Sequence, residues 1–320
     1  MTPEHFTIGT IEASEALLQD LYIGLRSKIR AWSLITQQTP QARMGYIGQH
    51  LVSVVTGFPG GRSGARGKDL ILPDGESAEI KTCYRVDQLG SCSKCQTQVS
   101  SVESTCPICG TNEIKRKDDS KWLIGVKDEK ELRALFEPRW YYLVLLDFTD
   151  MSASTDINAR IWRVDPKSIG FSYCMIDYYF NIKSSAPFNL WPFMLKFYLM
   201  KPELIYHAVI SSLDDSVTTV LFEGQKGKTQ IEPMQNLENY ARSSSDSLSD
   251  TDISAIAAQL DIDVSGLKRK EMLQKIQTKR DKNLVPEQRL LDLFAKALYG
   301  QRISPYLKFL PKNVIKPAEI

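Results

Sequence analysis

The sequence predicts an α/β protein with an inserted cysteine module and a small helical module near its C-terminus. Apolar residues recur at three- and four-residue steps from about Glu12 to Trp32, which indicates an amphipathic helix. The run Tyr141–Phe148 has the aromatic and β-branched content of a buried strand. Two Cys-x-x-Cys pairs and a serine-rich stretch interrupt this pattern, and each marks a separate module.

The composition is that of an ordinary globular protein. The 320 residues are 42% hydrophobic and 24% charged, as is ordinary for a globular protein with a real core. A net charge of +2 is too mild to indicate a polyanionic partner, so any nucleic-acid surface must come from local clustering of basic residues.

The chain shows no sequence typical of export or of membrane insertion. No basic and apolar leader opens it, and its longest apolar runs fall far short of the ~20 residues that span a bilayer. The stretch from Gly57 to Lys68 lacks the Gly-Lys-Ser/Thr ending of a phosphate loop. We therefore expect a soluble cytoplasmic protein with no membrane partner and no nucleotide cofactor.

The remaining elements follow in chain order. A second helix is expected from Arg43 to Thr56, followed by a glycine-rich stretch, two short strands and the cysteine module. Asn158 to Val164 is a further strand. The segment 241–250 has almost nothing to bury and is expected to be a linker, with helices at about 251–279 and 286–299 beyond it.

The most informative stretch is the hairpin around Pro73-Asp74-Gly75, each residue suited to its place in a tight turn. A three-residue loop makes Leu72 face Glu76, and the same register places Asp69 opposite Glu79. Lys81 then emerges on the same side of the sheet as Glu79, because side chains alternate along a strand. Two carboxylates and a lysine are predicted to converge.

Such a trio suits phosphodiester cleavage. Adjacent carboxylates repel one another unless a divalent cation lies between them, and hard oxygen ligands suit Mg²⁺. A lysine can hold and help deprotonate the attacking water while countering the charge of the phosphate. The competing interpretation is a surface hairpin with ordinary exposed charges, since Glu-x-Lys triplets are common by chance.

These residues resemble the PD-(D/E)XK nuclease superfamily, in which an Asp starts one strand and Glu-x-Lys lies on the next. Here they are Asp69 and Glu79-Ile80-Lys81. The preceding helix from Gly45 to Val52 and the glycine-rich segment from Arg62 to Asp69 are similar to those of type II restriction enzymes, and the match covers about residues 45–81.

The resemblance implies a restriction-endonuclease-like mixed sheet flanked by helices. It also implies that Asp69, Glu79 and the Ile80 carbonyl hold magnesium and that Lys81 handles water. Two residues depart from the pattern: Lys68 stands where a proline is common, and Gln49 stands where an acidic residue is frequent. Glutamine could still coordinate as an accessory ligand. Because it replaces a carboxylate, the resemblance does not imply a second strong metal site.

Four cysteines, Cys92, Cys95, Cys106 and Cys109, form two knuckles separated by ten residues, a spacing that resembles a zinc ribbon inserted at about 88–118. A closed four-thiolate site leaves no position for substrate, so its Zn²⁺ is expected to be structural. Disulfides and four unliganded thiols are the alternatives. The basic residues around the ribbon, Lys94 among them, favour DNA contact slightly over bracing a dimer partner.

The C-terminal segment 251–282 resembles the SAP motif, whose second helix opens with a pattern similar to Ser265-Gly-Leu-Lys268. The resemblance implies DNA-backbone contacts from its basic residues. A plain helical hairpin packed on the main domain is the alternative. The full set of expected DNA contacts is Arg62, Arg66, Lys94, Lys268, Arg269 and Lys270.

Taken together, the residues and the resemblance predict an endonuclease domain over 1–240, a linker at 241–250, the SAP-like module at 251–282 and a terminal helix and tail at 283–320. The predicted activity is that of a type II restriction endonuclease, a homodimer that cuts double-stranded DNA with Mg²⁺ and leaves 5′-phosphate ends. A structure-selective repair or junction nuclease and a non-catalytic, zinc-containing DNA-binding protein are the two alternatives.

Overall fold

A computed structural model describes residues 3–36, 38, 44–61, 68–100, 103–116, 121–149, 155–183, 188–190, 200–222 and 248–312. The chain divides into two compact units. Unit 1 comprises Met1–Trp122, Pro138–Arg163 and Glu203–Thr229, and unit 2 comprises Leu123–Glu137, Val164–Pro202 and Gln230–Ile320.

Unit 1 is built on a six-stranded mixed sheet in the order β1-β2-β7-β8-β10-β11. β2 and β7 are parallel, whereas the pairs β1–β2, β8–β10 and β10–β11 are antiparallel. The predicted strands at 141–148 and 158–164 are therefore confirmed, as is the α/β class with a mixed sheet. The strand bounds are β1 Leu70–Ile71, β2 Ser77–Tyr84, β7 Trp140–Phe148, β8 Ile157–Val164, β10 Glu203–Ile210 and β11 Val217–Leu221.

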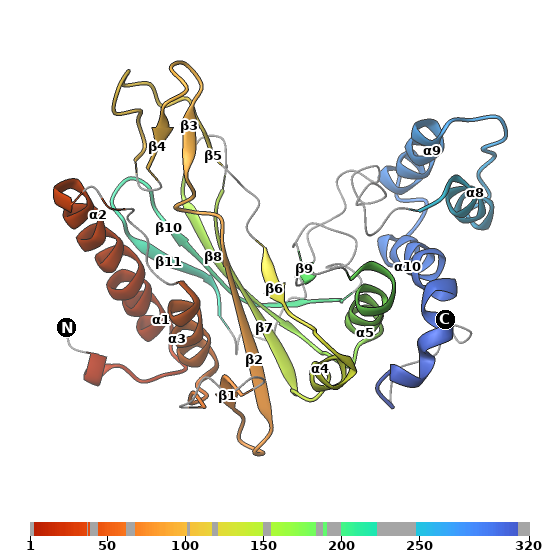
Figure 1. Cartoon of the computed structure of the whole chain (residues 1–320), viewed down its shortest axis with the longest axis horizontal. Coiled ribbons are helices and arrows are strands. Elements are labelled where there is room, and N and C mark those ends of the chain that lie inside the picture. Colours follow the sequence, from red (N-terminus) through yellow and green to blue (C-terminus); the bar gives the residue numbers. More distant parts are fainter. Residues whose placement is uncertain are drawn as a thin grey trace. The chain divides into compact units, whose positions relative to one another are not determined.

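Helices pack on one face of this sheet (Figure 1). The predicted helix over 43–56 is confirmed as α3, which contacts β2. The N-terminal helical bounds are η1 Pro3–His5, α1 Ile11–Leu17, the π-helical η2 Leu18–Gly24, α2 Leu25–Thr36 and α3 Met44–Thr56.

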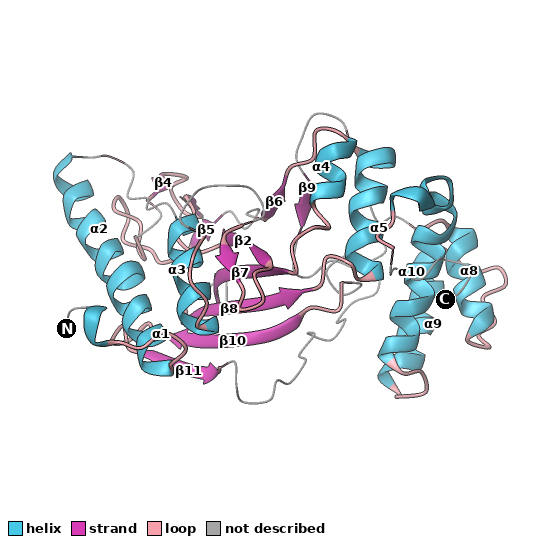
Figure 2. Cartoon of the chain, turned by 90° about the horizontal axis from the view of Figure 1, so that it is seen from below, coloured by secondary structure: helices cyan, strands magenta, loops and turns pink. Residues whose placement is uncertain are grey.

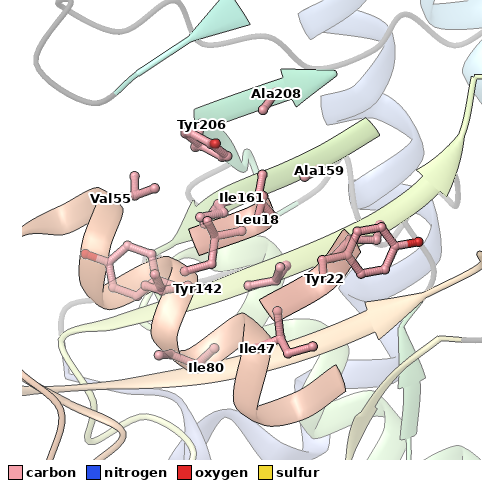
Figure 3. Close-up of a cluster of buried hydrophobic side chains, with 14 of the residues drawn as sticks. Leu18, Tyr22, Ile47, Val55, Ile80, Tyr142, Ala159, Ile161, Tyr206 and Ala208 are labelled. Carbon is pink, nitrogen blue, oxygen red and sulfur yellow. The ribbon is translucent and has the colours of Figure 1, made fainter. Parts of the chain in front are cut away.

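The core of unit 1 lies between these helices and the sheet (Figure 3). Leu18 and Tyr22 of η2 reach it from one side, and Ile80 of β2 and Tyr142 of β7 reach it from the sheet. Along β2, side chains alternate, so Ile80 points into this core while Glu79 and Lys81 leave on the other face. The core therefore determines which side of the strand carries the charged residues.

The single apolar stripe predicted from about Glu12 to Trp32 is only half correct. Leu18 and Tyr22 are buried, whereas Leu25 is 37% and Trp32 66% exposed. The reason is the π-helical segment η2, whose i→i+5 hydrogen bonds change the helical period and rotate the residues that follow. Residues beyond this segment that continue the α-helical spacing of the stripe therefore no longer face the core.

The cysteine module forms a separate three-stranded antiparallel sheet of β3 Gly90–Cys92, β4 Gln98–Val99 and β5 Ile114–Arg116, in the order β4-β3-β5. It follows β2 along the chain after only a short connection (Figure 1). Buried Val99 and Ile114 form a small core with Cys92 and Cys106. The cysteine module is thus a compact unit of its own inside the first unit.

Unit 2 is largely helical (Figure 2). The helical segment predicted over 251–279 is present as the two helices α8 and α9. The last helix, predicted over 286–299, is α10, which extends four residues past Tyr299 and has Pro286 at its N-cap rather than at its first helical position. No helix among the described residues has the length and apolar character needed to span a membrane. The bounds are β6 Trp122–Ile124, which begins at the last residue of unit 1, α4 Glu129–Ala134, α5 Ile169–Asp177, η3 Tyr178–Ile182, β9 Phe188–Leu190, α8 Asp250–Gln259, α9 Arg269–Asp281, α10 Glu287–Ile303 and η4 Ser304–Phe309.

Candidate active site and four-cysteine metal centre

The hairpin between β1 and β2 has the predicted register. The Gly75 N–H donates to the Leu72 carbonyl and the Leu72 N–H donates to the Glu76 carbonyl, both at 2.9 Å. Gly75 has φ +81°, a left-handed value that favours glycine. Leu70 pairs with Ala78, so one step further along the ladder Asp69 lies opposite Glu79. The turn chemistry therefore brings the two acidic residues to facing positions.

Asp69 is held by two donors. Its Oδ2 accepts a 2.8 Å hydrogen bond from the Ile80 N–H, and its Oδ1 accepts a 3.1 Å hydrogen bond from Gln49 Nε2 on α3. The strand β1 begins only at Leu70, so the carboxylate of Asp69 takes a ladder position that a backbone carbonyl would otherwise fill. Three segments of the chain meet at this side chain.

Glu79 and Lys81 lie two residues apart on the same face of β2, and Lys81 Nζ donates to Glu79 Oε1. Glu79 is only 5% exposed, whereas 28% of the Lys81 side chain is exposed. The acid is therefore buried in the sheet while the amine reaches toward solvent beside it.

A tight contact holds α3 against β2 next to these residues. A Cβ atom at Gly48 would lie 1.9 Å from Thr82 Oγ1 and 2.9 Å from Thr82 Cβ, so only glycine allows this approach. Gln49 follows directly in the helix, and Thr82 follows Lys81 in the strand. The contact therefore determines how far Gln49 lies from Asp69.

Burial makes the ionised form of Asp69 less favourable. The pKa of Asp69 is raised, mainly by desolvation, and the neighbouring Glu79 carboxylate raises it further. The Ile80 N–H and the Lys81 ammonium act in the opposite direction. A divalent cation bound between the two carboxylates would offset the desolvation and the repulsion together.

The donor set fits a hard cation. Asp69 and Glu79 supply carboxylate oxygens, which Mg²⁺ prefers. In a strand, the N–H and C=O of one residue face the same neighbour, so the Ile80 carbonyl faces the same edge as the N–H that Asp69 accepts from. Gln49 could supply an amide oxygen if its side chain turned over. These are the residues that the sequence singled out.

The four predicted cysteines form one cluster. Their sulfur atoms all lie within 4.8 Å of one another, with Cys92 Sγ and Cys109 Sγ 3.5 Å apart and Cys95 Sγ and Cys106 Sγ 3.5 Å apart. Tetrahedral zinc with Zn–S bonds of ~2.3 Å requires sulfur separations of about 3.8 Å. The cluster therefore fits a structural zinc ion.

Local backbone geometry forms both knuckles. The Gln96 N–H donates to the Cys92 carbonyl at 3.0 Å, and the Gly110 N–H donates to the Cys106 carbonyl at 2.9 Å. The Cys95 N–H points at Cys92 Sγ, 3.4 Å away, an orientation that stabilises a thiolate. Each knuckle is thus closed by its own few residues.

Two arginines, neither of them singled out by the sequence pattern, hold the module and its connection to β2. Within the module, Arg116 Nη1 donates to the carbonyls of Gln88 at 2.8 Å and Ser100 at 3.1 Å. Arg26 Nε of α2 donates to buried Asp87 at 2.7 Å. These contacts could not be predicted from the sequence, because the residues that they join lie up to 61 positions apart.

The expected DNA contacts have different surroundings. Lys94 is exposed and lies 3.4 Å from Glu113, and Lys268 and Lys270 are exposed at the start of α9. Arg269 instead turns inward, where Nη1 donates to the Leu248 carbonyl at 2.7 Å. The remaining two, Arg62 and Arg66, lie outside the described residues.

Comparisons with known proteins identify the family. The family model described as MamI restriction endonuclease matches residues 31–236, more than half of the chain. The type II restriction enzyme MamI of Microbacterium ammoniaphilum is 36% identical over 81 residues, which are 24% of this chain and 25% of that enzyme. The chain thus aligns with about a quarter of the length of this curated relative. No solved structure matches. On the family match, the chain belongs to the MamI restriction endonuclease family.

Proposed function

We propose that this protein is a type II restriction endonuclease that hydrolyses double-stranded DNA at a specific sequence with Mg²⁺ and leaves 5′-phosphate ends. The observation that carries the proposal is the hairpin that sets Asp69 opposite Glu79, with Lys81 beside Glu79. Family membership supports the same activity. The arrangement also agrees with the PD-(D/E)XK pattern, which we propose for the fold of the catalytic region.

Asp69, Glu79 and the Ile80 carbonyl would hold the magnesium ion. Bound there, it would polarise the phosphate and stabilise charge on the attacking and leaving oxygens. The protein residues act around it. The Ile80 N–H keeps the Asp69 carboxylate at the edge of β2, and Gln49 orients it from α3. Gln49 is proposed as an accessory residue in this site.

Lys81 is proposed to position the attacking water. Its amine can accept the water's proton when neutral and can donate hydrogen bonds to the phosphate when charged. Glu79 holds the amine on the reacting face of β2. The water would then attack phosphorus in line with the departing 3′ oxygen, which leaves the phosphate on the 5′ end.

The other parts of the chain would bind DNA. We propose an endonuclease domain over 1–240 that carries the zinc ribbon at about 88–118, a linker at 241–250, a SAP-like module at 251–282 and a C-terminal helix and tail at 283–320. Exposed Lys94, Lys268 and Lys270 suit phosphate contacts, whereas Arg269 is proposed to stabilise the module rather than to bind DNA. Cutting both strands would require a homodimer, and a restriction enzyme would work in the cytoplasm.

The direct test incubates the purified protein with phage DNA, with and without Mg²⁺. Discrete fragments that require the metal, and that end at one short sequence, support the proposal. Cleavage only at junctions or damaged sites would favour a repair nuclease. DNA binding with no cleavage across several divalent metals would favour a non-catalytic DNA-binding protein.

A further inference from the structure

The outward face of α3 next to Asp69 carries three residues, Gly45, Tyr46 and Gln49. Residues three and four apart on a helix are neighbours on its surface, so Gly45 and Tyr46 lie one turn before Gln49 on the same side. Gln49 in turn contacts Asp69 at 3.1 Å. One turn of helix rises about 5.4 Å, so this face begins within a few ångströms of the candidate active site.

Tyr46 is not used by the core. It is 62% exposed, although Met44, two residues before it, and Ile47, directly after it, are buried. Tyrosine supplies a large contact area at a low cost in side-chain entropy, and its hydroxyl can donate to a phosphate oxygen. An exposed tyrosine one turn from the candidate site is therefore well suited to bind substrate.

Gly45 is not required by the fold. A Cβ atom there would meet nothing within 4 Å among the residues that the structure describes, and Gly45 is not among those with positive φ. Glycine in a helix destabilises it relative to alanine. Gly48, by contrast, is required by its contact with Thr82. The bare backbone at Gly45 leaves open space beside the site without any benefit to packing.

We propose that Gly45 and Tyr46 form a contact surface for the DNA strand that flanks the scissile phosphate. This inference rests on the proposed function and extends it to how the substrate is held. The sugar–phosphate backbone would lie across Gly45, which has no side chain of its own to obstruct it, and the Tyr46 hydroxyl would donate to a phosphate oxygen. The Gly48 contact with Thr82 keeps this face at a constant distance from Asp69.

Two substitutions test the surface, Tyr46→Ala and Gly45→Leu. Each is made in a Lys81→Ala background, so that binding is measured without cleavage, on a duplex containing the sequence cut in phage DNA. We expect each to raise the Kd about tenfold. In protein with Lys81 intact, Tyr46→Ala should raise KM and leave kcat within about twofold, as expected for a binding residue.

Stability separates this result from misfolding. The Gly45→Leu variant should leave Tm unchanged or higher, because the Cβ position meets no atom of the described residues and leucine favours the helix more than glycine does. Trp32→Ala on α2, where the ring is 66% exposed, is the matched control and should leave the Kd unchanged. Wild-type affinity in both Gly45→Leu and Tyr46→Ala would overturn the inference even if the enzyme cuts DNA. Absence of metal-dependent cleavage by the wild-type protein would instead overturn the proposed function.

Discussion

The hairpin site and the four-cysteine module lie on one continuous stretch of chain, yet they form in different ways. In the cysteine module, each knuckle is closed by hydrogen bonds between residues four apart, and its small core comes from the module itself. At the hairpin, the turn aligns Asp69 with Glu79, but the contact of Asp69 with Gln49 comes from a helix twenty residues earlier. The first is a local structure, whereas the second depends on tertiary packing.

The comparison predicts that damage to each region has a different signature. A change in the hairpin chemistry should abolish the reaction and leave the fold intact. A change in the cysteine module should remove a metal ion and destabilise its surroundings. A change in the packing of α3 should both reduce cleavage and lower stability, each by a smaller amount.

Lys81→Ala is expected to have the largest effect. Removing the amine that we propose to position the attacking water should lower the cleavage rate by about 100- to 10,000-fold, the usual range for a general acid–base group. Single-turnover cleavage at saturating Mg²⁺ measures this rate. The affinity for DNA and Tm should stay close to those of the wild type, and wild-type cleavage by this variant would remove Lys81 from the reaction.

Cys106→Ser is expected to remove the structural zinc. The wild-type protein should contain about one zinc ion per chain, measured by atomic emission, and the variant should contain far less. Tm should fall by several degrees, because metal binding and folding of the module are coupled. Cys83→Ala is the matched control, since this cysteine is buried outside the cluster and its loss should leave the zinc content unchanged.

Gly48→Ala is expected to have an intermediate effect through packing. The added methyl group would overlap Thr82, and overpacking of this kind costs about 1–3 kcal/mol in the free energy of unfolding. Moving α3 outward should also weaken the Gln49–Asp69 contact and reduce cleavage. Gly45→Ala in the same helix is the control and should be neutral or slightly stabilising, so a Gly48 variant as stable as this control would contradict the packing argument.

Asp69→Asn is expected to have the smallest effect on stability, and the sign depends on pH. The pKa of Asp69 in the folded protein is raised above its ordinary value of 3.8, chiefly by burial, so its ionisation destabilises the metal-free fold. This loss develops as pH rises from the ordinary pKa through the raised one. Without metal, the asparagine variant should therefore be the more stable protein at neutral pH.

Denaturant unfolding at several pH values checks this prediction. The pH-dependent part of the difference between the two proteins should disappear well below pH 3.8, where residue 69 is neutral in both. Added Mg²⁺ should reverse the order, because only the wild type would gain stability from the bound ion. An asparagine variant less stable at neutral pH without metal would show that the Ile80 hydrogen bond outweighs the burial.

Much of the site could be predicted from the residues because its determinants are short-range. Gly75, with Pro73 and Asp74 before it, specifies a hairpin of one register, and that register alone pairs Asp69 with Glu79. The helix that ends at Thr56 and the strand that ends at Phe148 also follow from local pattern. The prediction of one apolar stripe in the N-terminal helix was partly wrong, because a π-helical segment changes the helical period and no single residue type indicates such a segment.

By itself, the sequence determined the hairpin register and the two cysteine knuckles, since each depends on residues within about a dozen positions of one another. Only the tertiary structure decided that Gln49 contacts Asp69, that α3 approaches β2 through Gly48, and that Arg26 binds Asp87 in the connection between β2 and the cysteine module. These contacts join residues that are distant in the chain, and their distances depend on how whole helices and strands pack. A pattern of residue types does not carry that information, because close packing is a property of the assembled core.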